Sequence, residues 1–336
     1  MRALVTGGGG FLGQYIVEML KERGDEVAVL GRRPYPQLEK MGVTCIQADL
    51  QDSGAISRAC KDKDAVFHVA ALAASWGPRE HFYQTNVKGT LNIIRGCQEN
   101  EVQKLIYTSS PSVVFNMESV ENGDEKLPYP RRYFAHYPET KAIAEQHVLA
   151  ANEPKGLLTC ALRPHLIYGP RDTHIIPMLL QRADQKRLMQ IGPGMNMVDM
   201  TYVTNAAIAH LQASDALAAD SAVAGQAYFI SDDEPVNLWD FVNTLLTRLG
   251  RPSVQKQISY STAYRLAFLL ESLHRTFSFL GEPRITRFLA SNFAHSHYFS
   301  MDKAKQDFGY KPLCTHAEGL RKTVEYFSNW EADGDS

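Results

Sequence analysis

The first half of the chain alternates short apolar runs with longer segments whose apolar residues recur at helical spacing. The apolar runs have the length and the β-branched content of buried strands, at residues 2–6, 26–30, 43–48, 65–70, 104–108 and 158–163. The segments between them include 11–20 and 87–94, where apolar side chains would share one helix face. Strands that alternate with helices favour right-handed crossovers, which produce a parallel sheet covered on both faces. We therefore predict an α/β fold with a doubly wound parallel sheet.

The pattern changes after about Pro164, where helical spacing dominates. Strand candidates become sparse, at 226–230 and 254–259, while Leu238–Leu249 has the spacing of an amphipathic helix. We predict one domain at 1–162 and a smaller, mainly helical lobe at 163–330, with the chain crossing between them more than once. The acidic end, 331–336, is predicted to be a flexible tail.

Four glycines follow the first predicted strand and open the first helix. Gly7 would permit the tight turn out of the strand, Gly10 the close approach of a pyrophosphate, and Gly13 the close packing of helix and sheet. The helix would begin with Phe11 and Leu12, and its free N–H groups would face the phosphates. This strand–turn–helix context predicts a dinucleotide-binding domain of the Rossmann type at 1–162, and the alternative is a turn with a structural role alone.

The ends of the next two strands indicate which dinucleotide binds. A carboxylate after the second strand would bond the ribose hydroxyls of NAD, but the chain has Arg32 and Arg33 there. Two guanidiniums suit the 2′-phosphate of NADP, so we predict NADP(H) rather than NAD(H); the alternative is a pair of solvated arginines. After the third strand, Asp49 and Leu50 are placed to meet the adenine, and Asp49 has an alternative role as the N-cap of a helix at 53–60.

A hydroxyl, a phenol and an amine are predicted to meet at the carboxyl end of the sheet. The fifth strand ends in Thr108, Ser109 and Ser110, and Tyr137 and Lys141 share one face at the start of a later helix. Ligands of α/β folds bind at this edge of the sheet. We predict Ser110, Tyr137 and Lys141 as the catalytic group, with Ser109 and Thr108 as competitors for the role of Ser110.

The chemistry of this group suits hydride transfer between a cofactor and a ketone or hydroxyl carbon. The alkoxide that forms on a reduced ketone needs a proton, and a phenol with a pKa of about 10 exchanges protons poorly at neutral pH. We expect the ammonium of Lys141 to lower the pKa of Tyr137 and to reach the nicotinamide ribose. Ser110 would donate a hydrogen bond to the substrate oxygen.

Composition and charge exclude several other classes of function. A net charge of -2 without a basic stripe argues against a nucleic-acid partner. The five cysteines are dispersed and form no CxxC pair, so we predict free thiols, no disulfide framework and no metal site. The N-terminus lacks the pattern of a signal peptide, so we expect a cytoplasmic protein.

An apolar segment at 263–280 has almost the length of a membrane span, but charged residues interrupt it. An amphipathic helix fits better, with an apolar face formed by Leu266, Leu269, Leu270, Leu273 and Phe277. Three roles remain open for this face: packing within the lobe, a lid over acyl chains, or a peripheral contact with a membrane surface.

The remaining candidates for substrate contacts rest on weaker patterns. Trp76 follows the fourth strand, where loops commonly line a substrate, and His165 and Tyr202 are similar cases. Each of the three could equally serve in core packing or in a structural hydrogen bond. Arg284, Arg287 and His297 could meet a substrate carboxylate.

Several motifs of the first half resemble the extended short-chain dehydrogenases/reductases, and among them the 3β-hydroxysteroid dehydrogenase/isomerase-like branch. The motifs are TGGGGFLG at 6–13, HVAA at 68–71, NVKGT at 86–90, YTSS at 107–110, YPETKAIAE at 137–145 and RPHLIYGP at 163–170. The resemblance implies the catalytic roles of Ser110, Tyr137 and Lys141. It also implies cofactor contacts at Ala70, Ala71, Pro164 and Ile167.

Stretches of the second half, at 196–210, 225–236, 281–289 and 297–312, resemble the bacterial 2-alkyl-3-oxoalkanoate reductases of long-chain olefin biosynthesis. That resemblance implies NADPH-dependent, reversible reduction of the C3 ketone of a two-tailed β-keto acid. It also implies a homodimer and, as pathway partners, a β-lactone synthetase, a β-lactone decarboxylase and an upstream thiolase. We expect Thr as often as Ser at position 110 in this group, and either hydroxyl can donate.

Three other functions remain open at this point. The chain could be a steroid or sterol 3β-hydroxy dehydrogenase, a sugar-nucleotide epimerase or dehydratase, or a non-catalytic NADP(H)-sensing protein. The apolar 263–280 segment argues against a nucleotide-sugar site, and the intact Tyr137 and Lys141 pair argues against a sensor.

Overall fold

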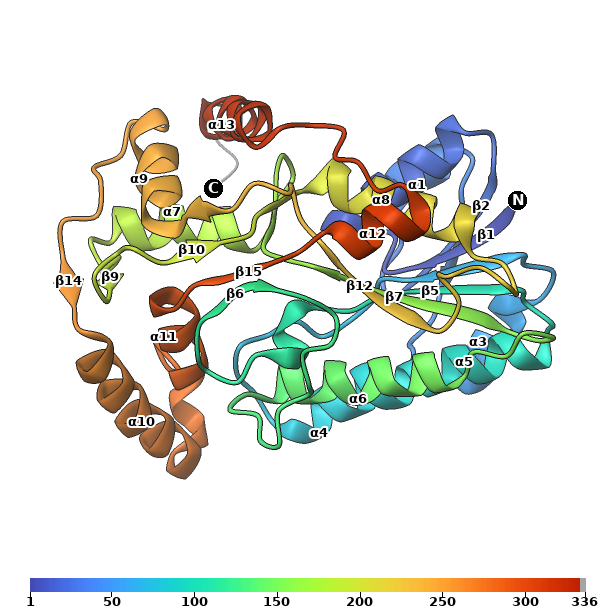
Figure 1. Cartoon of the computed structure of the whole chain (residues 1–336), viewed down its shortest axis with the longest axis horizontal. Helices are drawn as coiled ribbons and strands as arrows, with labels where there is room; N and C mark the ends of the chain where they lie inside the picture. The colour runs from blue at the N-terminus through green and yellow to red at the C-terminus, as the bar shows by residue number, and fades with distance from the viewer. Residues whose placement is uncertain (333–336) are drawn as a thin grey trace.

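A computed structural model describes residues 1–332 of the chain. The main sheet contains β1 (Arg2–Thr6), β2 (Glu26–Gly31), β3 (Thr44–Gln47), β4 (Ala65–His68), β5 (Lys104–Thr108), β7 (Leu158–Pro164) and β12 (Gln226–Ile230). All neighbouring strands are parallel, in the order β3-β2-β1-β4-β5-β7-β12. The order reverses between β1 and β4, which makes the carboxyl end of these strands the expected place for a ligand. The predicted α/β fold with a doubly wound parallel sheet is confirmed (Figure 1).

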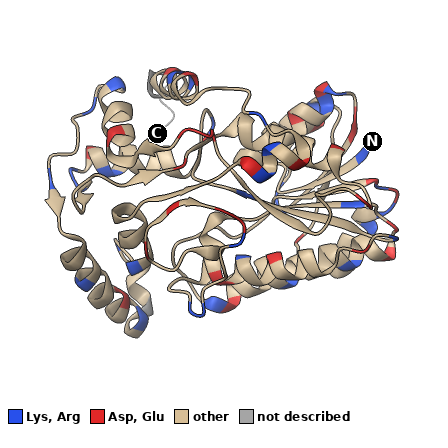
Figure 2. Ribbon diagram, viewed as in Figure 1, with Lys and Arg blue, Asp and Glu red and all other residues tan. Residues whose placement is uncertain are grey.

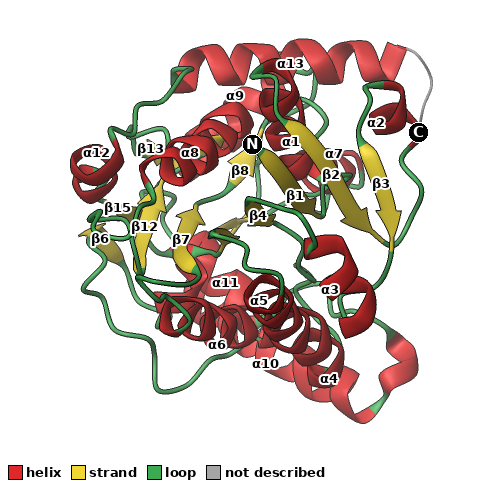
Figure 3. Ribbon diagram, turned by 90° about the vertical axis from the view of Figure 1, so that its right-hand side faces the viewer, coloured by secondary structure: helices red, strands yellow, loops and turns green. Residues whose placement is uncertain are grey.

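Helices cover both faces of this sheet (Figure 3). One face carries α1 (Phe11–Glu22) and α8 (Val203–Ala216), and the other carries α3 (Ser53–Cys60), α5 (Gly89–Glu99) and α6 (His136–Ala150). Shorter helical elements are α2 (Pro36–Lys40), α4 (Arg79–Phe82), a π-helical turn (Tyr83–Lys88) and a 3-10 turn (Pro111–Val114).

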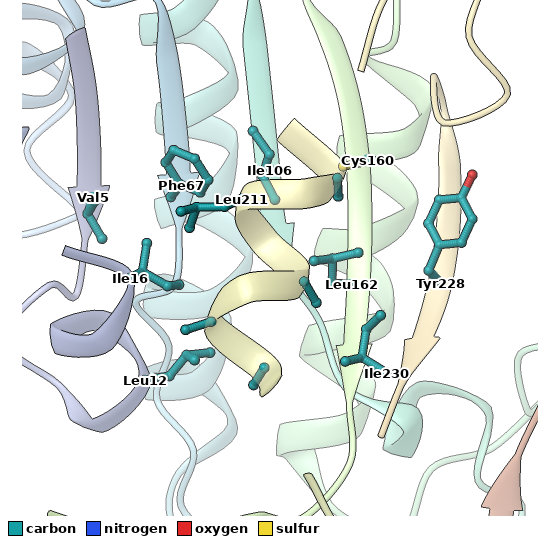
Figure 4. Packing of buried hydrophobic residues seen from close by; sticks show 14 of the residues in the cluster. Val5, Leu12, Ile16, Phe67, Ile106, Cys160, Leu162, Leu211, Tyr228 and Ile230 are labelled. Atoms are coloured by element: carbon teal, nitrogen blue, oxygen red, sulfur yellow. The ribbon is translucent and has the colours of Figure 1, made fainter. Parts of the chain in front are cut away.

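Alternation along the strands divides the buried side chains between two cores. In β1, Val5 belongs to the core under α1 and α8, whereas Leu4 belongs to the core under α3, α5 and α6. Figure 4 shows the first core, where Ile16 of α1 and Leu211 of α8 lie over the sheet residues Phe67 and Ile106. Strands buried on both faces need continuous apolar runs, which is why the first-half strands could be located from the sequence.

A second lobe is built from short strands and helices. Its strands are β6 (Val120–Gly123), β8 (Ile167–Tyr168), β9 (Gln190–Ile191), β10 (Met197–Val198), β11 (Thr201–Tyr202), β13 (Val236–Asn237), β14 (Gln257–Ile258) and β15 (His297–Phe299). Its helices are α7 (Ile175–Asp184), α9 (Leu238–Arg248), α10 (Tyr260–Thr276), α11 (Arg287–Ala294), α12 (Asp302–Phe308) and α13 (His316–Ala332), with a 3-10 turn at Ser278–Leu280. The lobe's four-stranded sheet has the order β13-β10-β15-β6.

The chain returns from this lobe to the main sheet. Helix α8 covers one face of the sheet, and β12 pairs with β7 along Cys160–Pro164. Residues 163–330 therefore contribute to both parts of the molecule. Of the predicted tail 331–336, residues 331 and 332 continue α13, and residues 333–336 lie outside the described residues.

Charged residues of both signs are interspersed along the ribbon (Figure 2). Within residues 1–332, no helix is both long and apolar enough to cross a membrane. All five cysteines are free thiols. Among the described side chains, no group of three or more potential ligands could hold a metal ion.

Candidate active site

The glycine turn between β1 and α1 leaves one side open. Gly7 has a φ of +70°, and a Cβ on Gly13 would lie 2.1 Å from the carbonyl oxygen of Gly7, so both positions require glycine. A Cβ on Gly10 would meet only that same oxygen within 4 Å. Gly10 is also the N-cap of α1, and no side chain bonds to the N–H groups of the first turn from this position. These N–H groups are therefore available to an anion. These features fit the pyrophosphate of a dinucleotide.

Tyr35 is a neighbour of this turn that the sequence analysis missed. A Cβ on Gly9 would lie 1.9 Å from the Tyr35 ring, and a Cβ on Gly31 would lie 2.2 Å from the Tyr35 hydroxyl. The ring therefore lies directly against both backbones, beside the exposed Arg32 and Arg33. Gly9 and Gly31 lack side chains and so indicate that another group packs against the backbone there. The sequence alone does not reveal that this group is the Tyr35 ring.

The N-cap of α3 is Asp52 and not Asp49, for which this role was the alternative to a contact with the adenine. The carboxylate of Asp52 accepts a hydrogen bond from the N–H of Ala55, whereas that of Asp49 accepts one from the N–H of Gln51. The alternative role of Asp49 as the N-cap was therefore wrong. Leu50 is buried, and it packs where a Cβ on Gly89 would otherwise lie.

The loop after β4 is held by polar side chains from two elements, β1 and the π-helical turn. The hydroxyl of Thr6 accepts a hydrogen bond from the N–H of Ala70. Asn86 accepts one from the N–H of Leu72 and donates from its amide to the hydroxyl of Thr140 on α6. Asn86 thus links the Ala70–Leu72 loop to the helix that carries Tyr137, a role that the sequence analysis did not assign.

The three hydroxyls after β5 have different surroundings. Thr108 bonds to Nε2 of His210 at 2.8 Å, and Ser109 is buried. Ser110 is half-buried, and its hydroxyl bonds to that of Ser112 at 2.9 Å. Burial raises the pKa of Tyr137, and the nearby hydroxyl of Ser110 opposes the shift. Of the three, Ser110 is therefore the hydroxyl that the structure brings to Tyr137.

Lys141 is buried with its ammonium group directed at the end of β5. Its Nζ donates to the carbonyl oxygen of Thr108 and lies 4.0 Å from the centre of the Tyr107 ring. Burial lowers the pKa of Lys141 to about 7, and the nearby carboxylate of Glu145 opposes this shift. We expected this ammonium to lower the pKa of Tyr137, but in this structure burial dominates and the pKa of the phenol is raised.

A buried ion pair links α6 to β7. Arg163 donates to both carboxylate oxygens of Glu145, at 2.9 and 2.6 Å, and Tyr129 donates to one of them. The guanidinium holds the pKa of Glu145 below its usual value against the effect of burial. Pro164 follows directly at the end of β7 and Ile167 begins β8, so both lie at the carboxyl end of the sheet.

The three predicted substrate residues have different positions. Trp76 lines a small cavity with Phe134 and Arg275. Tyr202 is buried in the core of the second lobe, where its ring packs against Tyr168, so its role there is core packing. His165 is buried as well, which makes a structural hydrogen bond its observed role.

The partner of His165 is His297. The carbonyl oxygen of Asn292 can only accept, so Nε2 of His297 donates to it at 2.8 Å. Burial lowers the pKa of both imidazoles, so both rings are neutral near pH 7. Nδ1 of His297 then accepts from Nε2 of His165 at 2.6 Å. His297 is therefore held in a structural pair rather than free to bind a substrate carboxylate.

The predicted helix at 263–280 is present as α10, followed by a 3-10 turn. Its buried side is formed by Ala263, Ala267 and Glu271. Of the predicted apolar face, Leu270 is half-buried, and the other four residues, Leu266, Leu269, Leu273 and Phe277, are exposed. Packing within the lobe is therefore not the role of this face.

Comparisons with known proteins agree with this geometry. Residues 4–260 match the model of the 3-beta hydroxysteroid dehydrogenase/isomerase family. The chain is 48% identical over 324 residues to a 2-alkyl-3-oxoalkanoate reductase of Stenotrophomonas maltophilia, which covers 96% of this chain and 98% of the relative. It is 40% identical over 340 residues to a sterol-4-alpha-carboxylate 3-dehydrogenase, decarboxylating, of Mus musculus, which covers 99% and 92%.

Solved structures show the same architecture over the full length. The crystal structure of a protein described as gox2253 has a TM-score of 0.78 and 27% identity, and the match covers 98% of both chains. UDP-glucose 4-epimerase of Thermus thermophilus, solved as a complex with NAD, has a TM-score of 0.74 and 25% identity over 100% of both chains. The chain therefore belongs to the 3-beta hydroxysteroid dehydrogenase/isomerase family, within the extended short-chain dehydrogenases/reductases, and is a nicotinamide-dependent oxidoreductase.

Proposed function

We propose that the chain reversibly reduces the C3 ketone of a 2-alkyl-3-oxoalkanoic acid to the 3-hydroxy acid with NADPH. The observation that carries the proposal is the placement of Ser110, Tyr137 and Lys141 at the carboxyl end of the sheet, the same edge at which the glycine turn follows β1. Relatives named 2-alkyl-3-oxoalkanoate reductase, at 48% and 41% identity over nearly the whole chain, support the choice of substrate.

The side chains present suit the proton part of this reaction. The bound nicotinamide would supply or take back the hydride. Ser110 donates a hydrogen bond that orients the substrate oxygen, and Tyr137 gives its phenolic proton to the alkoxide as it forms. A phenol whose pKa is raised by burial is protonated at neutral pH, which is the form that reduction requires. For the reverse reaction, we propose that Lys141, once protonated, lowers the pKa of that phenol.

The preference for NADP(H) rests on the residues after β2. Arg32 and Arg33 are exposed, and neither forms an ion pair with a carboxylate in the described part of the chain. Two uncompensated guanidiniums beside the glycine turn favour a 2′-phosphate over the two free hydroxyls of NAD. Asp49, Leu50, Ala70, Ala71, Pro164 and Ile167 are proposed as further contacts of the cofactor.

A direct experiment is NADPH oxidation by the purified protein with a synthetic 2-alkyl-3-oxo acid and a 3-oxosteroid in parallel. We expect turnover of the oxo acid. Turnover of the steroid alone would favour the second candidate, a sterol or steroid 3β-hydroxy dehydrogenase, which the sterol-4-alpha-carboxylate relative supports. Tight NADPH binding without any hydride transfer would favour a sensing protein.

The cellular setting is also a proposal, supported by the resemblance to the olefin-pathway reductases. We propose a homodimer in the cytoplasm that associates with a β-lactone synthetase and a β-lactone decarboxylase. Co-expression followed by size-exclusion chromatography would test both the dimer and the association.

A peripheral contact with a membrane surface is proposed for α10 and the turn after it. Seven of the twelve large apolar side chains exposed in the described chain lie between 266 and 280, including Phe279 at 82% exposure. Arg265 lies on the same helix and is exposed, which suits anionic headgroups.

A further inference from the structure

A cavity of about 310 Å³ lies between α10, α11 and the segment that leads into α6. Its walls include residues 131–136, which end directly before Tyr137, together with Arg275 and Arg287. A smaller cavity shares Phe134, His136 and Arg275 with it and extends to Trp76 in the loop after β4. Both spaces therefore lie along the segment that leads into Tyr137.

The cavity contains more positive charge than its carboxylates can neutralise. Glu139 is bound by Arg79 at 2.8 Å, and Glu271 is bound by Arg287 at 2.7 Å. Glu271 also accepts a hydrogen bond from the backbone N–H of Arg287. Glu139 lines this cavity and Glu271 lines the smaller one, and both carboxylates are thus already engaged.

Three guanidiniums at the cavity remain without a close counter-ion. Arg275 lies 3.9 Å from Glu271, whose charge is already engaged by Arg287. Arg131 and Arg132 form no ion pair with any carboxylate that the structure describes. Aromatic rings hold two of these groups in place, since Arg132 lies over Phe134 at 5.3 Å and Arg275 over Trp76 at 5.7 Å.

We propose that Arg275, with Arg132, binds the carboxylate of the substrate. The inference rests on the proposed function: in a 2-alkyl-3-oxo acid the carboxylate is attached to C2, the carbon next to the one that is reduced. One carbon then separates the carboxylate from C3, and we place it against the wall that Arg275 and His136, the neighbour of Tyr137 in the chain, form. Planar guanidiniums match a carboxylate in geometry, and these two have no stronger partner.

The test compares an acid with the ketone that lacks its carboxylate. For wild type, the 2-alkyl-3-oxo acid should have a higher kcat/KM than the matching dialkyl ketone. Arg275→Met and Arg132→Met should lower kcat/KM for the acid by roughly 10- to 100-fold and leave that of the ketone unchanged. Arg275→Lys should recover part of the loss. Arg248→Met, at an exposed arginine on α9 that lines neither cavity, is the control and should behave as wild type.

A second measurement separates this inference from the reductase assignment. Calorimetric titration of the NADPH-loaded protein with a 2-alkylalkanoate, which has the carboxylate and both tails but no ketone, should give a Kd that rises roughly 10- to 100-fold in Arg275→Met. Equal losses for acid and ketone, or an unchanged Kd, would overturn the carboxylate site. Intact binding by a wild type that reduces neither substrate would support the site and overturn the proposed reductase function.

Discussion

Burial raises the pKa of the Tyr137 phenol and so keeps it protonated, and the hydroxyl of Ser110 lowers that pKa in part. Tyr137→Phe removes the proton donor while it preserves the ring, so kcat should fall by roughly 10²- to 10⁴-fold with little change in the Kd of NADPH. Stopped-flow turnover and fluorescence titration would measure the two quantities. Tyr228→Phe, which loses a buried phenol at the outer edge of β12, is the control and should keep its turnover. Near-normal turnover by Tyr137→Phe would reject the acid–base role.

Arg32 and Arg33 should determine the choice of cofactor. Replacing both by Ala should raise the Kd of NADPH by roughly 10- to 100-fold and leave that of NADH almost unchanged, because only NADPH has a 2′-phosphate. Titration of both cofactors would measure the ratio, with the exposed Arg95→Ala on α5 as control. An unchanged ratio would show that these arginines are only solvated surface residues.

Asp199 should make stability depend on pH. Its Oδ2 accepts a hydrogen bond from the N–H of Phe299, Oδ1 has no partner among the described atoms, and burial raises its pKa to about 7. The unfolded chain ionises near pH 4, so the folded state holds the extra proton between about pH 4 and 7 and loses stability as pH rises through that window.

The asparagine in Asp199→Asn cannot ionise, so this variant should not lose stability as pH rises through that window. Relative to wild type, the variant should gain roughly 1–3 kcal/mol of unfolding free energy between pH 5 and pH 8. Urea unfolding at the two values would measure the difference. A parallel pH profile for the two proteins would mean that Asp199 is ionised in the folded state throughout this range.

At the scale of secondary-structure elements, the contact between α6 and β7 depends on one ion pair. Glu145→Ala leaves Arg163 as an unpaired charge within the core, so the free energy of unfolding should fall by about 3–5 kcal/mol. Glu325→Ala, which breaks an exposed ion pair with Arg321, is the matched control and should cost less than about 1 kcal/mol. Denaturant titrations of both variants would measure the difference. A similar cost for both would show that the buried pair contributes no more than a surface one.

The strands of the main sheet could be located from the sequence, because burial on both faces leaves a continuous apolar run. The contacts between distant elements could not be located in this way. The bond from Asn86 to Thr140 joins residues 54 positions apart, and the pair of His165 and His297 joins residues 132 apart. For α10, the spacing predicted an apolar face but not the surface that this face meets. The small residues Ala263 and Ala267 face the protein, whereas Leu266, Leu269 and Leu273 are exposed.

At the scale of the whole molecule, the exposed face of α10 gives one end of the protein an apolar surface (Figure 1). Leu269→Ser combined with Phe279→Ser should lower the fraction bound to vesicles of phosphatidylcholine and phosphatidylglycerol by at least about tenfold, because each side chain contributes about 1.5–3 kcal/mol when buried. Flotation assays would measure the bound fraction. Leu313→Ser, 61% exposed elsewhere on the surface, is the control and should bind as wild type does. Absence of wild-type binding would leave the lid over acyl chains as the role of this face.

The place of β12 at the edge of the main sheet affects how the chain can fold during its synthesis. Residues 226–230 complete the edge beside β7, yet more than sixty residues of the second lobe and α8 separate the two strands in the chain. While the chain is still emerging from the ribosome, β7 lacks its outer neighbour, and its backbone groups on that side await a partner. A gene fragment that stops near residue 162 would encode a sheet with this edge uncovered, so the nucleotide-binding half should aggregate when it is produced alone.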